Sequence, residues 1–210
     1  MVDLPNVTLV AVSSVKIGET LASLTNSMSG IRFAESKLVT HYQGLVVPDG
    51  IKVENCDRIS SMDAYSHYVM YDLDRHVETD YCLLVQWDGF VLRPTHWESS
   101  FLDYDYIGAP WPVSKDAYIT FTGERVRVGN GGFSLRSKKL LECTRKHSVP
   151  FLQDRGFYNE DGNICVYNRD LLLGLGIKFA PIEVAARFSQ ETQMSETEGI
   201  FPFGFHRNPK

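Results

Sequence analysis

The sequence contains few cysteines, and no pair of them has the spacing of a metal or redox motif. Four cysteines are spread over 210 residues and none forms a C-x-x-C pair, which excludes a zinc ribbon and a thioredoxin-like site. They are Cys56, Cys82, Cys143 and Cys165. We interpret them as small hydrophobic residues of the core, in a protein from a reducing compartment.

The sequence also lacks a membrane span, a signal peptide and an excess of positive charge. No apolar run approaches the roughly 20 residues that cross a bilayer, and the N-terminal MVDLPNVT lacks the basic-then-apolar order of a signal peptide. Lys and Arg number 21 against 26 Asp and Glu, a net charge of −5, which argues against general nucleic-acid binding. We therefore expect a soluble, cytoplasmic protein with no membrane span and no nucleic-acid partner.

The composition is that of a folded globular protein. With 43% hydrophobic and 22% charged residues, the bulk of the chain is too apolar to be disordered. At about 150 residues per domain, the length favours one domain over residues 1–210.

Hydrophobic periodicity predicts alternating strands and helices in the first 90 residues. The β-branched run 7–12 is typical of a strand covered on both faces, and an apolar stripe from Ile17 to Ile31 predicts a helix that Gly30 helps to end. The predicted helices span 17–30, 62–77, 137–146 and 161–173, and the predicted strands span 7–12, 37–40, 51–53, 81–85, 90–92, 126–128, 133–135 and 177–180. An aromatic loop is expected over 97–111. The alternation predicts an α/β fold whose central, mostly parallel mixed sheet is flanked by helices.

Ligands of such sheets bind beyond the carboxyl ends of the strands, which directs attention to the turns there. Asp88 follows the predicted strand 81–85 on a tight turn with Gly89. Mg²⁺ and Mn²⁺ are held by one or two carboxylates together with ligand phosphates, so Asp88 can anchor a metal–diphosphate complex. An ordinary Asp-Gly hairpin turn fits the same residues.

Two further positions carry acid–base or metal-binding groups. Glu160 and Asp161 begin a predicted helix, where a carboxylate can act as general base and helix-terminal N–H donors would keep it ionised near neutral pH. Helix capping is the alternative role. His206 lies among aromatic residues near the C-terminus and can bind a divalent metal, or be an ordinary partly buried histidine.

The order of these features resembles nucleotide-sugar glycosyltransferases of the GT-A fold. A first strand ending in small polar residues, a D-x-D-like turn, a Gly-Gly segment, a Glu-Asp helix start and a late histidine follow one another. The blocks 85–92, VQWDGFVL, and 104–111, YDYIGAPW, resemble more closely a glycosyltransferase family that includes a chlorella-virus-encoded domain. The resemblance implies a Rossmann-like domain with a nucleotide-binding half, 1–90, and an acceptor-binding and catalytic half, 91–210, either minimal or part of a longer multidomain protein.

The resemblance also implies roles for individual residues. Asp88 and His206 match the metal ligands, whereas the first aspartate of the D-x-D motif is replaced by Gln86, which can hydrogen-bond a ribose or sugar hydroxyl. Asp161 matches the catalytic base of inverting members, with Glu160 as the alternative. The implied donor-binding residues are Val12, Ser13, Thr40, Arg58, Ser66, Gln86, Trp87, Gly131 and Gly132, and the implied acceptor-binding residue is Trp111. The glycines let backbone approach the sugar closely, or form a turn before strand 133–135.

The resulting hypothesis is a metal-dependent enzyme of viral or other glycan biosynthesis. It would use Mn²⁺ or Mg²⁺ to move a hexose or deoxyhexose from a UDP-sugar to a glycan or glycoprotein hydroxyl, with inversion. The alternatives are a non-catalytic sugar or nucleotide-sugar binding module, which the missing first aspartate favours, and a nucleotidyltransferase. The absence of a G-x-G-x-x-G or lysine-rich phosphate loop after the first strand argues against the latter.

Overall fold

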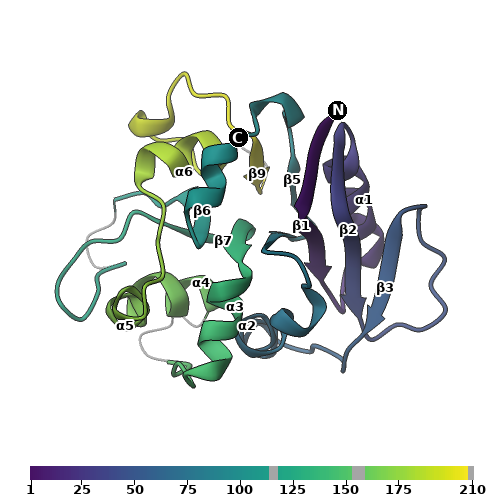
Figure 1. Ribbon diagram of the computed structural model, residues 1–210, viewed down its shortest axis with the longest axis horizontal. Coiled ribbons are helices and arrows are strands. Elements are labelled where there is room, and N and C mark those ends of the chain that lie inside the picture. The colour runs from purple at the N-terminus through teal and green to yellow at the C-terminus, as the bar shows by residue number, and fades with distance from the viewer. Residues whose placement is uncertain (114–117, 153–158, 208–210) are drawn as a thin grey trace.

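A six-stranded mixed sheet forms the centre of the computed structural model, which describes residues 1–113, 118–152 and 159–207 (Figure 1). The strand order is β3-β2-β1-β4-β7-β6. The strands are β1 (Val2–Val12), β2 (Ile31–Thr40), β3 (Ile51–Asn55), β4 (Tyr81–Val85), β6 (Tyr106–Pro110) and β7 (Val128–Ser137). The first four are parallel, whereas β7 runs antiparallel to both β4 and β6. The expected mostly parallel mixed sheet is confirmed.

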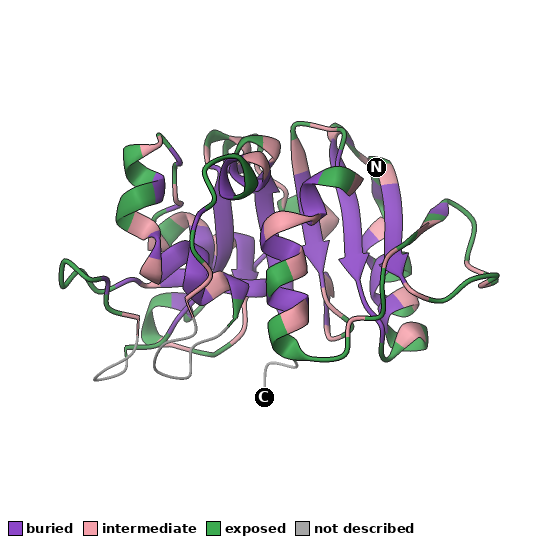
Figure 2. Ribbon diagram, turned by 90° about the horizontal axis from the view of Figure 1, so that it is seen from below, coloured by how far each residue is buried: buried purple, intermediate pink, exposed green. Residues whose placement is uncertain are grey.

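Helices cover both faces of this sheet. The main helices are α1 (Ile17–Met28), α2 (Met62–Tyr71), α3 (Lys138–Lys146) and α6 (Ile182–Phe188). Leu9 and Leu83 pack with α1 and α6, while Val10 and Leu84 pack with α2 and α3, because successive strand residues point to opposite faces. Buried residues accordingly fill the strands, and the helices expose residues on their outer sides (Figure 2). This double cover explains the continuous apolar runs.

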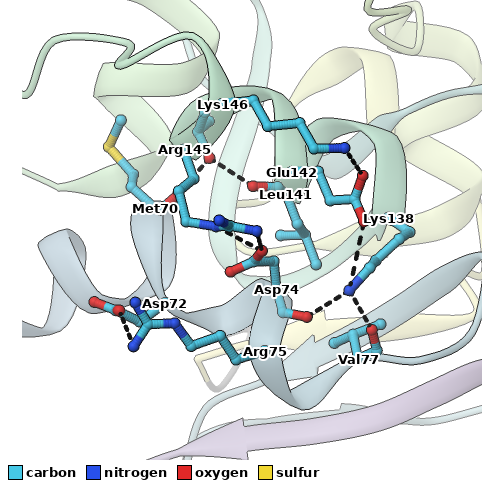
Figure 3. A network of polar contacts seen from close by, with 11 residues as sticks. Met70, Asp72, Asp74, Arg75, Val77, Lys138, Leu141, Glu142, Arg145 and Lys146 are labelled. Carbon is cyan, nitrogen blue, oxygen red and sulfur yellow. Dashed lines mark hydrogen bonds and ion pairs between the residues drawn. The ribbon is translucent and has the colours of Figure 1, made fainter.

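A polar network fixes α3 against the 3₁₀ turn that follows α2, Leu73–His76 (Figure 3). Asp74 is buried, and its Oδ2 accepts hydrogen bonds from Arg145 Nε at 2.8 Å and Nη2 at 2.6 Å. Lys138 Nζ donates to the carbonyls of Asp74 and Val77 at 2.5 and 2.6 Å. The helix predicted over 62–77 therefore ends at Tyr71, and the 3₁₀ turn takes the place of its last turn.

A second, three-stranded sheet brings the last described segment beside the turn after β4. Its strands are β5 (Gly89–Val91), β9 (Gly204–His206) and β8 (Ser189–Gln190), in the order β5-β9-β8. Figure 1 shows β9, from the yellow end of the chain, beside β5. β5 pairs antiparallel with β9 and β8 pairs parallel with it. Segments more than 100 residues apart therefore meet at one edge of the fold.

Several predicted elements are wrong, mainly in the second half of the chain. A strand, β6, lies within the expected loop 97–111 because it pairs with β7, a distant partner that local sequence does not reveal. Residues 177–180 form only an isolated bridge, between Phe179 and Tyr106. Ile31 begins β2 instead of ending α1, since Gly30 takes a φ of 81° and turns the chain.

The predicted helix 161–173 is three consecutive pieces. They are α4 (Glu160–Gly162), a π-helical turn (Asn163–Tyr167) and α5 (Arg169–Gly174). The side chain of Asn163 bonds the backbone of Leu152 in both directions, and Asn168 Nδ2 donates to the Pro150 carbonyl. These contacts divert the chain from a regular helix.

The cysteines are free, and Cys82, Cys143 and Cys165 are buried as expected, whereas Cys56 is partly exposed. Across the three described ranges, no helix has the length and apolarity that crossing a membrane requires.

Candidate active site

Two adjoining cavities lie beyond the carboxyl ends of β1 and β4. The first, which we call the β1 cavity, measures about 290 Å³ and is mainly lined by the segment after β1, the segment before α2, and Trp87. The second, the central cavity, measures about 230 Å³ and is lined by residues such as Asn130, Asp161 and His206. Met62 and Gln86 line both, so the two cavities adjoin. A ligand longer than either cavity can therefore span the pair.

A third cavity of about 520 Å³ continues outward from the central one. This outer cavity shares Trp111, Tyr118, Glu191 and Arg207 with the central cavity and adds Pro112, Thr192 and Gln193. The central cavity therefore adjoins the β1 cavity through Met62 and Gln86 and the outer cavity through a different set of residues.

His206 lines the central cavity, and Asp88 lies next to it. His206 Nε2 lies 3.3 Å from Asp88 Oδ1, and both side chains are largely buried. The pairing of β5 with β9 produces this contact, because Gly89 lies opposite His206 and the Arg207 N–H donates to the Asp88 carbonyl at 2.9 Å. The two residues implied as metal ligands are therefore brought together.

The electrostatic surroundings of this pair favour charge on both partners. Burial acts to raise the pKa of Asp88, but the contact with His206 outweighs it and holds that pKa below its ordinary value. Burial likewise acts to lower the pKa of His206, but Asp88 and Glu191 raise it to about 9. In the metal-free chain, an imidazolium therefore lies between two carboxylates.

The residues present fit a hard divalent cation. Asp88 Oδ1 is buried and forms no hydrogen bond, and a carboxylate oxygen 3.3 Å from an imidazole nitrogen can share one cation with it. Among residues 1–113, 118–152 and 159–207, no three His, Cys, Asp or Glu side chains gather to hold a metal. Further ligands of Mg²⁺ or Mn²⁺ would therefore come from water and from phosphates of a bound molecule, as is usual for Mg²⁺.

Asp161 is the carboxylate that faces the central cavity from the start of α4. Its Oδ1 accepts a hydrogen bond from the Gly162 N–H at 2.7 Å, and its Oδ2 accepts one from the Gly131 N–H at 3.0 Å. Burial and the neighbouring Glu160 charge raise the pKa of Asp161 to about 7, although the two N–H donors and Arg136 act to lower it. We expected the N–H donors to keep Asp161 ionised at neutral pH, but with a pKa of about 7 the carboxyl group is only partly ionised there.

Glu160 is committed to a buried ion pair instead. Its Oε1 accepts a hydrogen bond from Arg136 Nη2 at 2.9 Å, and Arg136 is completely buried. A buried guanidinium needs this counter-charge, because breaking such a pair costs about 3–5 kcal/mol. Of the two acidic residues, Asp161 is thus the one left to react with a ligand.

Two of the three glycines of β7, Gly131 and Gly132, make room for these side chains. A Cβ on Gly132 would lie 2.1 Å from His206 Nε2, and one on Gly131 would lie 2.3 Å from Glu160 Oε1. The space beside the glycines is therefore filled by the protein's own site residues. Their approach to a sugar remains a prediction.

The two tryptophans of the predicted site lie in different surroundings. Trp87 is 40% exposed, lines the β1 cavity and has Lys16 Nζ 3.0 Å above its ring. Trp111 is only 3% exposed and stacks on Tyr118 with ring centroids 4.0 Å apart. Trp87 thus offers a ring to a ligand, whereas Trp111 contributes an edge to the cavities.

The other predicted residues divide into two groups. Val12 and Ser13 line the β1 cavity, and Gln86 lies where it meets the central cavity. Thr40 and Ser66 are fully buried and Arg58 is exposed, and none of these three lines the described cavities.

The sequence interpretation missed other lining residues, including Tyr65, Asn130, Tyr118, Glu191 and Arg207. No motif surrounds Glu191, and only strand pairing brings it here.

The fold is that of a known class of enzymes. No curated protein matches the sequence. The chain is similar to a solved structure described as "Crystal structure of a glycosyltransferase involved in the glycosylation of the major capsid of PBCV-1". The two share 12% sequence identity with a TM-score of 0.56, over 95% of this chain and 91% of that chain. The likeness shows the fold, and it confirms the Rossmann-like GT-A architecture that the sequence resemblance predicted.

The family is shown by a separate match. Residues 51–206 match the family described as "Protein of unknown function (DUF5672)". This range holds β4, the whole three-stranded sheet and α4, and thus Asp88, Asp161 and His206. The chain therefore belongs to the DUF5672 family, and its fold is similar to that of the PBCV-1 glycosyltransferase.

Proposed function

We propose that this protein is a metal-dependent, inverting glycosyltransferase that moves a hexose or deoxyhexose from a UDP-sugar to a hydroxyl of a glycan or glycoprotein. One observation carries the proposal: Asp161 and His206 line a single cavity that adjoins the β1 cavity, and His206 contacts Asp88. A base, an anchor for a diphosphate and a pocket for a nucleoside are the three parts that such a transfer needs. The glycosyltransferase fold supports the same conclusion.

The donor would lie across the adjoining β1 and central cavities. The β1 cavity has mostly apolar walls with hydroxyls from Ser13 and Ser14, which suits a nucleoside, and the exposed ring of Trp87 borders it. Gln86, at the junction, offers an amide to a ribose or sugar hydroxyl. The transferred sugar would then occupy the central cavity, and the acceptor would enter from the outer cavity beside Trp111.

Asp161 would act as the general base. One of its carboxylate oxygens takes the proton of the acceptor hydroxyl while the acceptor oxygen forms a bond to the anomeric carbon. The bond from that carbon to the diphosphate oxygen breaks, and its electron pair leaves with UDP. The N–H groups of Gly131 and Gly162 hold the carboxylate in place for this proton transfer.

Asp88 and His206 would hold Mn²⁺ or Mg²⁺ next to the diphosphate. The cation would supply charge neutralisation for the leaving group. A cation is needed because the anionic donor must bind a chain that itself has a net charge of −5. No cluster of three His, Cys, Asp or Glu side chains that could hold a metal occurs in the described part of the chain, so water and the diphosphate itself would complete the coordination.

The test separates chemistry from binding. A panel of UDP-sugars is screened for Mn²⁺-dependent thermal stabilisation, which identifies the donor by mass action. With that donor, Asp161→Asn should lower transfer by about 10²–10⁴-fold while calorimetry finds unchanged binding of UDP and Mn²⁺. Asp170→Asn, an exposed acidic residue of α5, is the matched control and should retain full activity. Near wild-type transfer by Asp161→Asn would refute the base assignment.

A binding module without turnover is the second candidate. The replacement of the first D-x-D aspartate by Gln86 and the small number of protein ligands around Asp88 favour it. Calorimetry with UDP, with and without Mn²⁺, distinguishes the two. Metal-dependent nucleotide binding with slow donor hydrolysis supports the enzyme, whereas sugar binding indifferent to nucleotide supports the module.

A further inference from the structure

Three side chains lie in a row across the three-stranded sheet. β9 is its central strand and carries His206, while Asp88 directly precedes β5 on one side and Glu191 directly follows β8 on the other. Gly89 lies opposite His206, and Gln190 lies opposite Phe205. The strand register therefore places a carboxylate on each side of one imidazole.

The two carboxylates face different nitrogens of the ring. Asp88 Oδ1 lies 3.3 Å from Nε2, and Glu191 Oε1 lies 3.6 Å from Nδ1. Nδ1 is buried and makes no hydrogen bond to any described residue. Glu191 thus cannot share a cation with Asp88 on the Nε2 side, and its position suits a different task.

The ring has little freedom to turn away from this arrangement. His206 is 5% exposed, and Gly132 lies so close to its Nε2 side that a Cβ there would come within 2.1 Å of that atom. The other partner of Glu191, Arg207 Nη1 at 3.5 Å, belongs to a side chain that is 70% exposed. An exposed partner of this kind holds a carboxylate only weakly, so the contact with the buried Nδ1 is the stronger interaction of Glu191.

We infer that Glu191 is a positioning residue that accepts a hydrogen bond from the Nδ1–H group of His206 and thereby presents the Nε2 lone pair to the cation. Histidines that bind metals commonly donate their other ring N–H to a carboxylate, which fixes the tautomer and the ring orientation. The inference rests on the proposed function, because it takes Asp88 and His206 as the metal ligands. It adds a residue that the sequence interpretation did not single out.

The experiment measures metal affinity directly. Mn²⁺ binding in the presence of UDP is titrated by electron paramagnetic resonance for the wild type, Glu191→Ala and Glu191→Gln. Removing an outer-shell partner of a metal ligand typically costs 10–100-fold in metal affinity, and we expect that loss for Glu191→Ala. Glu191→Gln should recover part of the lost Mn²⁺ affinity, because its amide oxygen can still accept a hydrogen bond from the Nδ1–H group.

Controls separate this effect from charge and folding. Glu196→Gln removes one negative charge from the same segment, where Glu196 pairs with Arg127 at 2.7 Å, and should leave Mn²⁺ affinity unchanged. Thermal unfolding checks that each variant is folded. UDP binding without metal should be the same in all four proteins.

Nitrogen-15 spectra of histidine-labelled protein with Mg²⁺ and UDP give a second readout. The wild type should show His206 protonated at Nδ1 only, and Glu191→Ala should lose that signature.

Each outcome decides between the proposals. Equal Mn²⁺ affinity for the wild type and both Glu191 variants overturns this inference and leaves the proposed function intact. An equal loss in Glu196→Gln and Glu191→Gln also overturns it, because the effect would then be one of net charge. A wild type that binds UDP with no influence of Mn²⁺ overturns the metal part of the proposed function, and this inference with it.

Discussion

The raised pKa of Asp161 predicts an unusual pH dependence for the transfer reaction. An ordinary aspartate is fully ionised above pH 5, and a base of that kind would produce a flat profile through neutral pH. Asp161 differs, because burial and the Glu160 charge raise its pKa to about 7. Since only the ionised carboxylate can accept the acceptor proton, kcat/KM should rise with pH through about 7.

The magnitude follows from the ionised fraction. With a pKa near 7, roughly nine-tenths of Asp161 is ionised at pH 8 and roughly one-tenth at pH 6, so kcat/KM should fall about tenfold over that interval. The assay is kcat/KM for the donor found by screening, between pH 5 and pH 9, with Mn²⁺ saturating at each pH. Saturation keeps metal binding out of the profile.

Glu160→Gln tests the cause of the shift. Glu160 lies next to Asp161 and its charge raises the pKa of that residue, so the neutral variant should move the profile to lower pH. The substitution also weakens the ion pair with the buried Arg136, and up to about 3–5 kcal/mol of stability should be lost. The activity is therefore measured well below the melting temperature of the variant. A flat wild-type profile from pH 5 to pH 8, or a midpoint that Glu160→Gln does not move, would refute the reasoning.

Three other substitutions test separate parts of the structure. Gly132→Ala should displace the His206 ring, because the added Cβ would lie 2.1 Å from Nε2; Mn²⁺-dependent thermal stabilisation by UDP should disappear, and its persistence would contradict the packing. Trp87→Phe should remove most of the fluorescence change caused by UDP, since Trp87 is 40% exposed at the β1 cavity whereas Trp111 is buried. Asp74→Asn replaces a carboxylate that accepts two Arg145 hydrogen bonds far from the site, and should cost about 1–3 kcal/mol. A melting temperature lower by about 2–4 °C per kcal/mol with unchanged kcat/KM is expected, and a large loss of activity would link this network to the site.

Local sequence located most elements of the first half of the fold, although helix 62–77 ends early at Tyr71 and β2 already begins at Ile31. The run 7–12, the stripe from Ile17 and the strand 81–85 have the periodicity of the elements that form there, because their apolar faces are set by burial against the layer next to them. The rule that ligands bind beyond the carboxyl ends of parallel strands then selected Ser13, which lines the β1 cavity, and Asp88, which contacts His206 of the central cavity. Asp161 and His206 were found by chemistry, as a carboxylate at a helix start and a histidine among aromatics.

In the second half, local sequence indicated α3 and parts of β5 and β7, but tertiary structure decided how the strands pair. β6 and the three-stranded sheet depend on pairing between segments distant in the chain, and such pairing leaves little trace in local periodicity. The strand register places Glu191 beside His206. Glu160 forms an ion pair with the buried Arg136, whereas Asp161 is available to a ligand in the cavity.

The sequence by itself thus determined which residue types are available at the strand ends and along which faces the elements pack. The pKa of Asp161, the partners of His206 and the role of Gly132 depend on desolvation and on contacts a few ångströms long, which exist only once the chain is folded.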